Sequence, residues 1–246
     1  MGNYKIILQY DGTDYNGWQR LKDVKNTIQG RLERIVSEMT GEETEVIGSG
    51  RTDAGVHALG QVANFHTKAD FEAEYVKSYI NTYLPKDIAL IKAEAVDDRF
   101  HSRFNAKSKT YVYRIWNDIV PNVFENRFVY SYPKALDVAA MREAAGKLVG
   151  KHDFMAFCSN HRTKKSTVRT IYAADVEEIG NEIRIVFRGD GFLYNMARIM
   201  AGTILQSGSG EFDPSAIDGV FESRKRENAG ITLPAKGLIL EKVEYD

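Results

Sequence analysis

The segments Thr170–Ile179 (TIYAADVEEI) and Glu182–Arg188 (EIRIVFR) decide the fold of this chain. Both are rich in β-branched and aromatic residues, which favour strands. Only Gly180 and Asn181 lie between them, and a two-residue connection that contains glycine is typical of a β-hairpin. We therefore expect an antiparallel pair of strands at this point in the chain.

Predicted helices flank this hairpin on both sides. One spans about 135–149 and is closed by Gly150, and the other spans about 192–206. Strands are expected at the two ends of this half of the chain, at 109–116 and 237–245. The resulting order is strand, helix, strand, strand, helix, strand, which is the order of a ferredoxin-like βαββαβ unit.

The first hundred residues give the same order. Apolar residues recur at intervals near 3.6 residues from Ile28 to Met39, which predicts a helix that ends at Gly41. A second helix is expected at about 71–83, before a proline. Four strands are expected in this half, at 4–10, 45–47, 60–66 and 87–96.

The predicted fold class is therefore α+β, with two ferredoxin-like βαββαβ halves and largely antiparallel sheets. We expect an N-terminal domain over 1–105 and a C-terminal domain over 106–246. The two halves show no visible sequence similarity, so the repeat is one of topology.

Charge and composition limit the class of protein. Lys+Arg is 33 and Asp+Glu is 34, so the formal net charge is -1. This balance excludes a histone-like or ribosomal-type basic protein, and taken alone it argues against a nucleic-acid partner. The single cysteine, Cys158, cannot form an internal disulfide, and we expect a cytoplasmic protein. The first residues lack the apolar core of a signal peptide, and no membrane segment is expected.

No metal site and no cofactor are expected either. The five histidines and the lone cysteine show no zinc-type spacing. The glycine-rich stretch Gly48–Ala58 (GSGRTDAGVHA) fits neither a dinucleotide-binding nor a P-loop pattern. Its three glycines permit tight turns or the close approach of a ligand. Arg51 and Asp53 are close enough in sequence to form an ion pair, so a purely structural turn and a carboxylate site both remain open.

Gly48–Ala58 resembles the active-site signature of the tRNA pseudouridine synthase I family, the TruA-type enzymes. Ser102, Lys109 and Ala197 depart from the residues usual there, and Lys109 in place of arginine weakens one expected phosphate contact. Further strings of the family match in order along essentially the whole chain, at Tyr10–Gln19, Phe100–Phe104, Lys109–Arg114, Lys151–Phe154, Gly191–Arg198 and Pro234–Leu238.

This resemblance implies a pseudouridine synthase fold and a homodimeric isomerase that needs no cofactor. Its substrate would be the anticodon stem-loop of tRNA, at uridines 38, 39 and 40. It implies that Asp53 is the essential carboxylate, that Arg198 is its ion-pair partner, and that Tyr111 stacks on the flipped uracil. The residues expected to bind the substrate are Arg51, Arg103, Lys109 and Leu238.

Positive charge is concentrated in three segments despite the neutral total. Residues 99–114 carry five basic residues and no acid, residues 20–34 a net +3, and residues 151–169 a net +4. Aromatic residues lie among or near them, as expected where bases stack and phosphates are neutralised. Segment 151–169 is equally well explained as a solvated loop, and Tyr111 as a core residue.

Three other functions remain as alternatives. A non-catalytic RNA-binding module shares the βαββαβ order, but no RNP1-like string is present. A glycosidase needs two cooperating carboxylates, and only Asp11 and Asp14 are candidates for the carboxylate that would act together with Asp53. A regulatory ferredoxin-like dimer leaves the 48–58 motif unexplained.

Overall fold

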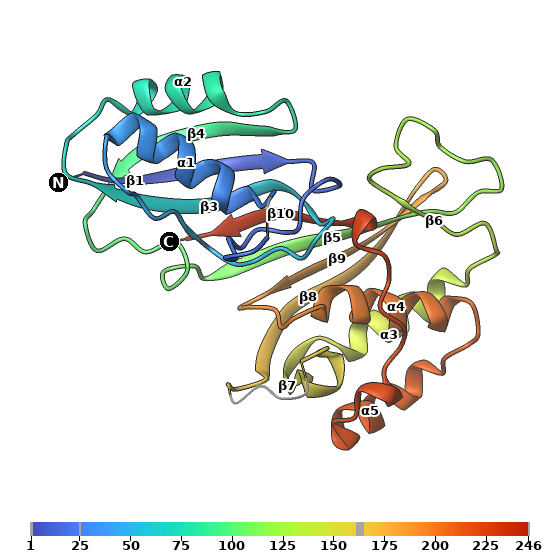
Figure 1. The fold of residues 1–246 in the computed structure, drawn as a ribbon. Helices are drawn as coiled ribbons and strands as arrows, with labels where there is room; N and C mark the ends of the chain where they lie inside the picture. The colour runs from blue at the N-terminus through green and yellow to red at the C-terminus, as the bar shows by residue number, and fades with distance from the viewer. Residues whose placement is uncertain (1, 25, 161–164, 246) are drawn as a thin grey trace. The chain divides into compact units, whose positions relative to one another are not determined.

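A computed structural model of the chain describes residues 2–24, 26–160 and 165–245 (Figure 1). These residues form two compact units. The first comprises the described residues up to Lys107 together with those from Leu240 onward, and the second is Ser108–Ile239. The sequence-based division lay at 105/106 with the last strand in the second half. In the structure most of that strand, β10 (Leu238–Glu244), belongs to the first unit.

The first unit has the predicted order of elements. They are β1 (Gly2–Tyr10), α1 (Ile28–Thr40), β2 (Ile47–Gly48), β3 (His57–Thr67), α2 (Ala73–Tyr83) and β4 (Ile88–Val96). β1 lies between β3 and β4 and runs antiparallel to both, with Ile6 opposite Ala63 on one side and Ala93 on the other. α1 packs against α2, and α2 packs against β4 (Figure 1).

Local chemistry explains the helix and strand limits here. Thr27 caps α1 by accepting a hydrogen bond from the Gly30 amide, and Gly41 ends the helix at φ 72°. The predicted strand at 45–47 is almost lost, because side chains of α1 take the backbone groups of Val46. Gln29 donates to its carbonyl and Glu33 accepts from its amide.

The second unit contains the predicted hairpin, together with two short strands, one short α-helix and several 3₁₀ turns that the sequence did not indicate. β8 (Val168–Ile179) and β9 (Glu182–Gly189) pair antiparallel, and β9 also pairs with β5 (Ser108–Trp116). The predicted helices are α3 (Val138–Lys147) and α4 (Met196–Gly208). The additional strands and α-helix, too short for a periodic signal, are β6 (Tyr130–Ser131), β7 (Gly150–Asp153) and α5 (Ile217–Ser223).

Both predicted helices of this unit are shorter than expected. Asp137 caps α3 by accepting hydrogen bonds from the amides of Ala139 and Ala140. Asn195 is in the left-handed region at φ 61°, so α4 cannot start before Met196.

The α+β class with largely antiparallel strands is confirmed. In the described ranges, no helix has both the length and the apolar character needed to cross a bilayer.

Candidate active site

The loop that carries Asp53 joins β2 to β3, and a side chain of β3 holds it in place through hydrogen bonds. The Ser49 hydroxyl donates to the side-chain oxygen of Gln61 (2.8 Å), and the Gln61 amide donates to the Gly50 carbonyl (3.1 Å). Both side-chain groups are fully buried. Because buried polar groups are costly to leave unpaired, these bonds hold the first half of the loop in one conformation.

A second loop, residues 11–19, packs on the Asp53 loop. The Trp18 amide donates to the Thr52 carbonyl (3.0 Å), and the Gly55 amide donates to the Tyr15 carbonyl (3.3 Å). The string Tyr10–Gln19 therefore has a definite role in this unit, because its backbone binds and positions the Asp53 loop.

Two glycines make this packing possible. A Cβ at Gly12 would lie 2.0 Å from the Val56 carbonyl oxygen. Gly17 has φ +87°, and a Cβ there would lie 2.7 Å from the Thr52 carbonyl oxygen. Real side chains do not tolerate such distances, so the two loops approach more closely than any other residue type permits.

Tyr10, at the end of β1, holds the middle of the loop. Its hydroxyl and that of Thr52 lie 2.8 Å apart in a hydrogen bond. Burial raises the pKa of Tyr10 to about 12, although the hydrogen bonds from Thr52 and Gln61 oppose the rise. The phenol therefore stays protonated at neutral pH.

We expect Tyr10→Phe to lower the free energy of unfolding by about 1–2 kcal/mol at pH 8, because Thr52 loses its buried partner. This difference should shrink above pH 10. The unfolded phenol ionises near pH 10 while the folded one keeps its proton to about 12, so the wild type loses stability as the pH rises between these values. Urea unfolding at pH 8 and pH 11 measures both effects. A difference that does not change with pH would contradict the assigned cause.

Asp53 itself is half-buried, and its carbonyl accepts a hydrogen bond from the Val56 amide (3.1 Å) to close the turn. Arg51 is exposed, and among the residues described its guanidinium makes no hydrogen bond or ion pair. An Arg51–Asp53 bridge is therefore not what holds the loop. The loop is positioned by Ser49, Thr52 and the backbone, which leaves the Arg51 side chain pointing to solvent.

Tyr111 and Lys109 lie on β5, in the second unit. The Tyr111 ring is 7% exposed and meets the edge of the Phe192 ring, with centroids 4.9 Å apart. Tyr113, two residues along the strand, is fully buried and donates to the Pro234 carbonyl (2.8 Å). Tyr111 is therefore nearly buried, and its ring has a fixed aromatic neighbour.

Arg198 lies in the first turn of α4 and is fixed by two hydrogen bonds. Its Nε donates to the Leu233 carbonyl (2.7 Å), and Nη1 donates to the side-chain oxygen of Asn195 (2.8 Å). Burial raises the pKa of Tyr113, and the positive charge of Arg198 opposes this rise, which places the guanidinium near that phenol. An arginine that only faces solvent from a helix would not be held by hydrogen bonds at two of its nitrogen atoms, as Arg198 is.

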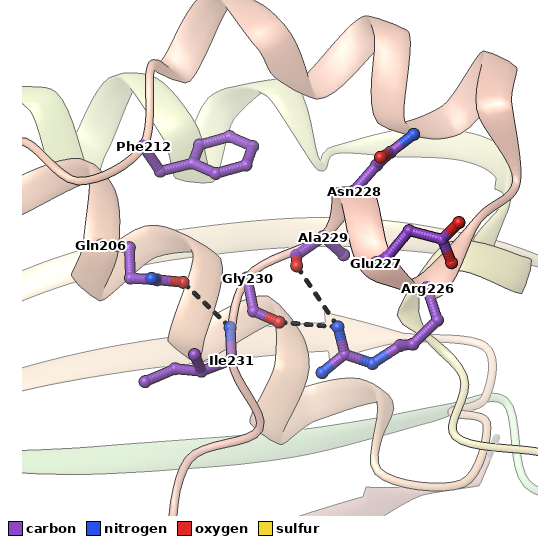
Figure 2. A pocket seen from close by; sticks show the side chains of 8 residues that line it. All are labelled: Gln206, Phe212, Arg226, Glu227, Asn228, Ala229, Gly230 and Ile231. Atoms are coloured by element: carbon purple, nitrogen blue, oxygen red, sulfur yellow. Dashed lines mark hydrogen bonds between the residues drawn. The ribbon is translucent and has the colours of Figure 1, made fainter.

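A pocket of about 610 Å³ lies elsewhere in the second unit (Figure 2). Arg226 spans one side of it and donates to the carbonyls of Ala229 and Gly230, and the Ile231 amide donates to Gln206 (Figure 2). None of the site residues indicated by the sequence lines it. Its contacts instead fix the segment that leads to Leu233, which in turn holds Arg198.

The structure assigns the sequence-predicted site residues to the two units. Asp53, Arg51 and Arg103 are in the first unit; Lys109, Tyr111, Arg198 and Leu238 are in the second. Sequence reasoning missed the residues that position them, namely Tyr10, Trp18, Thr52, Gln61 and Asn195. The glycines of Tyr10–Gln19 and Gly48–Ala58 are the signal that could have shown that these two loops pack closely.

The three basic segments differ in how much of their positive charge is paired with acidic side chains. Arg114 is held between Glu125 (2.8 Å) and Glu182 (2.7 Å), so its charge is balanced within the second unit. Arg20 pairs with Glu33 (3.0 Å). The predicted contributions of Lys25, Arg162 and Lys164 lie outside the described residues. Within the described ranges, no group of three or more His, Cys, Asp or Glu side chains is placed to hold a metal ion.

A family profile and curated relatives that match this chain are described as tRNA pseudouridine synthases. A family profile described as tRNA pseudouridine synthase matches residues 6–105 and 144–246. A tRNA pseudouridine synthase A 2 of Bacillus cereus is 47% identical over 245 residues, covering 100% of both chains. A protein of the same name from Clostridium perfringens is 45% identical with the same coverage. A solved Cbf5-Nop10-Gar1 complex aligns with 82% of this chain and 54% of its own, at 13% identity and a TM-score of 0.34.

Proposed function

Because the chain belongs to the tRNA pseudouridine synthase family, as an isomerase that converts uridine to pseudouridine in tRNA, we propose that it acts on the anticodon stem-loop at positions 38, 39 and 40, with Asp53 as its essential carboxylate. One observation carries the assignment of Asp53. It is the carboxylate at the centre of a loop that two other segments, 10–19 and β3, hold rigidly in place.

The reaction needs a single anion close to the sugar–base bond. The N-glycosidic bond of uridine breaks, the base rotates, and C5 bonds to the ribose. C5 then loses its proton and N1 gains one, so the product is an isomer of the substrate. Cationic character develops on the ribose as the bond breaks, and the Asp53 carboxylate stabilises it from a fixed position. A preorganised charge in a half-buried loop is worth more than the same charge in water, because it needs no reorganisation during the reaction.

The remaining residues receive roles in the same proposal. Arg198 pairs with the carboxylate and keeps it ionised, Tyr111 stacks on the uracil, and Leu238 packs against the base from its other side. The exposed Arg51 fills the space that the flipped nucleotide leaves or holds a phosphate. Lys109 and Arg103 contact phosphates.

Arg198→Lys is expected to lower kcat by about 10²-fold with little change in the KM for tRNA. A lysine cannot replace the bonds to Leu233 and Asn195 and also present a second nitrogen to a carboxylate. Steady-state kinetics on unmodified tRNA measure this split. A change confined to KM would place Arg198 in RNA binding instead.

The position assignment is tested with tRNA transcripts that carry uridine at only one of positions 38, 39 and 40, and with a fourth transcript that has cytidine at all three. We expect pseudouridine in each of the first three and none at these sites in the fourth, in buffer without metal or nucleotide cofactor. Modification of the fourth transcript at another uridine, with the first three unchanged at 38–40, would overturn the position assignment while leaving the isomerase activity intact.

The proposal includes a homodimer in the cytoplasm. The absence of a possible internal disulfide supports the location. The loop between β5 and β6 supports the dimer, because four of its apolar side chains are at least 70% exposed, which is unusual in one short segment of a monomer. They are Ile119, Val120, Val123 and Phe124. Light scattering at two protein concentrations tests the dimer.

A further inference from the structure

The turn at residues 101–105 of the first unit presents an aromatic ring to solvent. Phe104 is 77% exposed. One face of its ring meets the His101 ring, with centroids 4.1 Å apart and an interplanar angle of 36°. Such exposure is far more than a packing role requires, because most of the ring contributes nothing to the core.

Hydrogen bonds fix the conformation of this turn. The Nδ1 atom of His101 accepts from the amides of Arg103 (3.1 Å) and Phe104 (3.4 Å). The Asn105 amide donates to the His101 carbonyl (3.0 Å), and the Asn105 side-chain oxygen accepts from the His101 amide (2.6 Å). Phe104 therefore projects from a preorganised support, and little backbone entropy remains to be lost when a ligand binds it.

The turn is also attached to the strand that leads into the Asp53 loop. The Ser102 hydroxyl donates to the Ile47 carbonyl (2.5 Å), and the Ser102 amide donates to the side-chain oxygen of Asn64 (2.9 Å). Ile47 pairs with Asn64 in the β2–β3 ladder, immediately before the Asp53 loop begins. Ser102 is fully buried. The position of Phe104 is thus set relative to Asp53 within a single unit.

The charges around Phe104 indicate what it binds. Arg99 and Arg103 are exposed, and no acidic residue occurs between positions 99 and 107, the nearest in sequence being Asp97 and Asp98. An apolar protein surface would have to desolvate these cations, whereas a nucleobase flanked by phosphates satisfies the ring and the charges together. An exposed aromatic face among cations is the arrangement of a stacking platform for unpaired nucleotides.

We propose that Phe104 stacks on an unpaired base of the tRNA other than the reacting uridine, and that Arg103 neutralises a neighbouring phosphate. This inference rests on the proposed function, since it takes tRNA bound at Asp53 as the ligand. It adds a second base contact at a fixed place on the same unit, and this contact contributes to affinity and not to the chemical step.

The test compares three variants of one residue, Phe104→Ala, Phe104→Leu and Phe104→Trp. The dissociation constant is measured by fluorescence anisotropy on an unreactive transcript with cytidine at positions 38–40, and kcat is measured on unmodified tRNA. We expect the Ala and Leu variants to bind about 5- to 150-fold more weakly, because leucine keeps apolar area but lacks a π face. The Trp variant should bind at least as tightly as the wild type, and kcat at saturation should stay within about two-fold in all three.

Two controls separate stacking from other effects. Tyr83→Ala removes another exposed aromatic of the same unit (53% exposed) and should leave tRNA affinity unchanged. Arg103→Gln should reduce the slope of log affinity against log salt by about one, whereas Phe104→Ala should leave that slope unchanged.

Several results would overturn the inference. They are an unchanged affinity in Phe104→Ala, a Leu variant that binds like the wild type, or an affinity loss accompanied by a fall of more than about 5 °C in the unfolding midpoint, which would indicate a structural role. A different variant distinguishes a failure of the proposed function from a failure of this inference. An active Asp53→Asn variant would refute the catalytic assignment without changing the binding series for Phe104.

Discussion

Asp53→Asn is expected to lower tRNA turnover by at least about 10³-fold while leaving the dissociation constant for tRNA within a few-fold. Asparagine has nearly the same shape as aspartate but carries no charge, so it cannot stabilise the cationic ribose. The loop should keep its conformation, because Ser49, Thr52 and the backbone supply the bonds that fix it. Single-turnover kinetics with excess enzyme measure the loss, and anisotropy measures the affinity.

A matched control is available on the neighbouring loop. Asp14 is exposed and was one of the two weaker carboxylate candidates, so Asp14→Asn should retain activity within about three-fold. Full activity in Asp53→Asn would refute its role. A requirement for divalent metal would contradict the mechanism, and a wild-type protein that binds tRNA but never turns it over would favour a binding module.

Gly12→Ala is expected to have the second large effect. Its Cβ would lie 2.0 Å from the Val56 carbonyl oxygen, which is backbone and cannot move aside as a side chain can. The 11–19 loop must shift away from the Asp53 loop. We expect the free energy of unfolding to fall by about 2–3 kcal/mol and the midpoint by about 5–10 °C. The displaced carboxylate should cost about 10²-fold in kcat/KM.

The control for this prediction is Gly146→Ala. Gly146 lies in α3, and a Cβ there meets no atom within 4 Å. This substitution should raise stability by about 0.5–1 kcal/mol, because alanine loses less conformational entropy than glycine in a helix. Thermal unfolding of both variants measures the two changes in stability. A stable and active Gly12→Ala variant would show that the two loops do not need their close contact.

The sequence predicted the α+β class and the order of the main elements because these depend on local patterns. The helix from Ile28 follows from apolar residues at a period near 3.6, and the β8–β9 hairpin follows from a two-residue glycine turn. The Gly48–Ala58 string was also legible, because its residue types are infrequent in combination. Different residues therefore indicated the fold class and the candidate carboxylate.

Element limits depended on contacts that no local pattern reveals. The strand predicted at 45–47 is reduced to Ile47–Gly48, because side chains of α1 bind the backbone groups of Val46. The start of α4 was set by the left-handed conformation of Asn195. The predicted positive charge of Arg114 is balanced by two glutamates, one of them 68 residues away in sequence. The first and the last of these outcomes depend on partners that are not neighbours in the sequence.

The sequence by itself determined which residue types this protein has for its chemistry, an aspartate in a glycine-rich loop and an arginine beside Asn195. Only the tertiary structure decided how they are held. Tyr10, Gln61 and Gly12 fix the Asp53 loop through buried hydrogen bonds and a backbone contact too close for a side chain. The physical reason is that propensity and periodicity act between neighbours, whereas burial and hydrogen bonding join groups that meet only when the chain has folded.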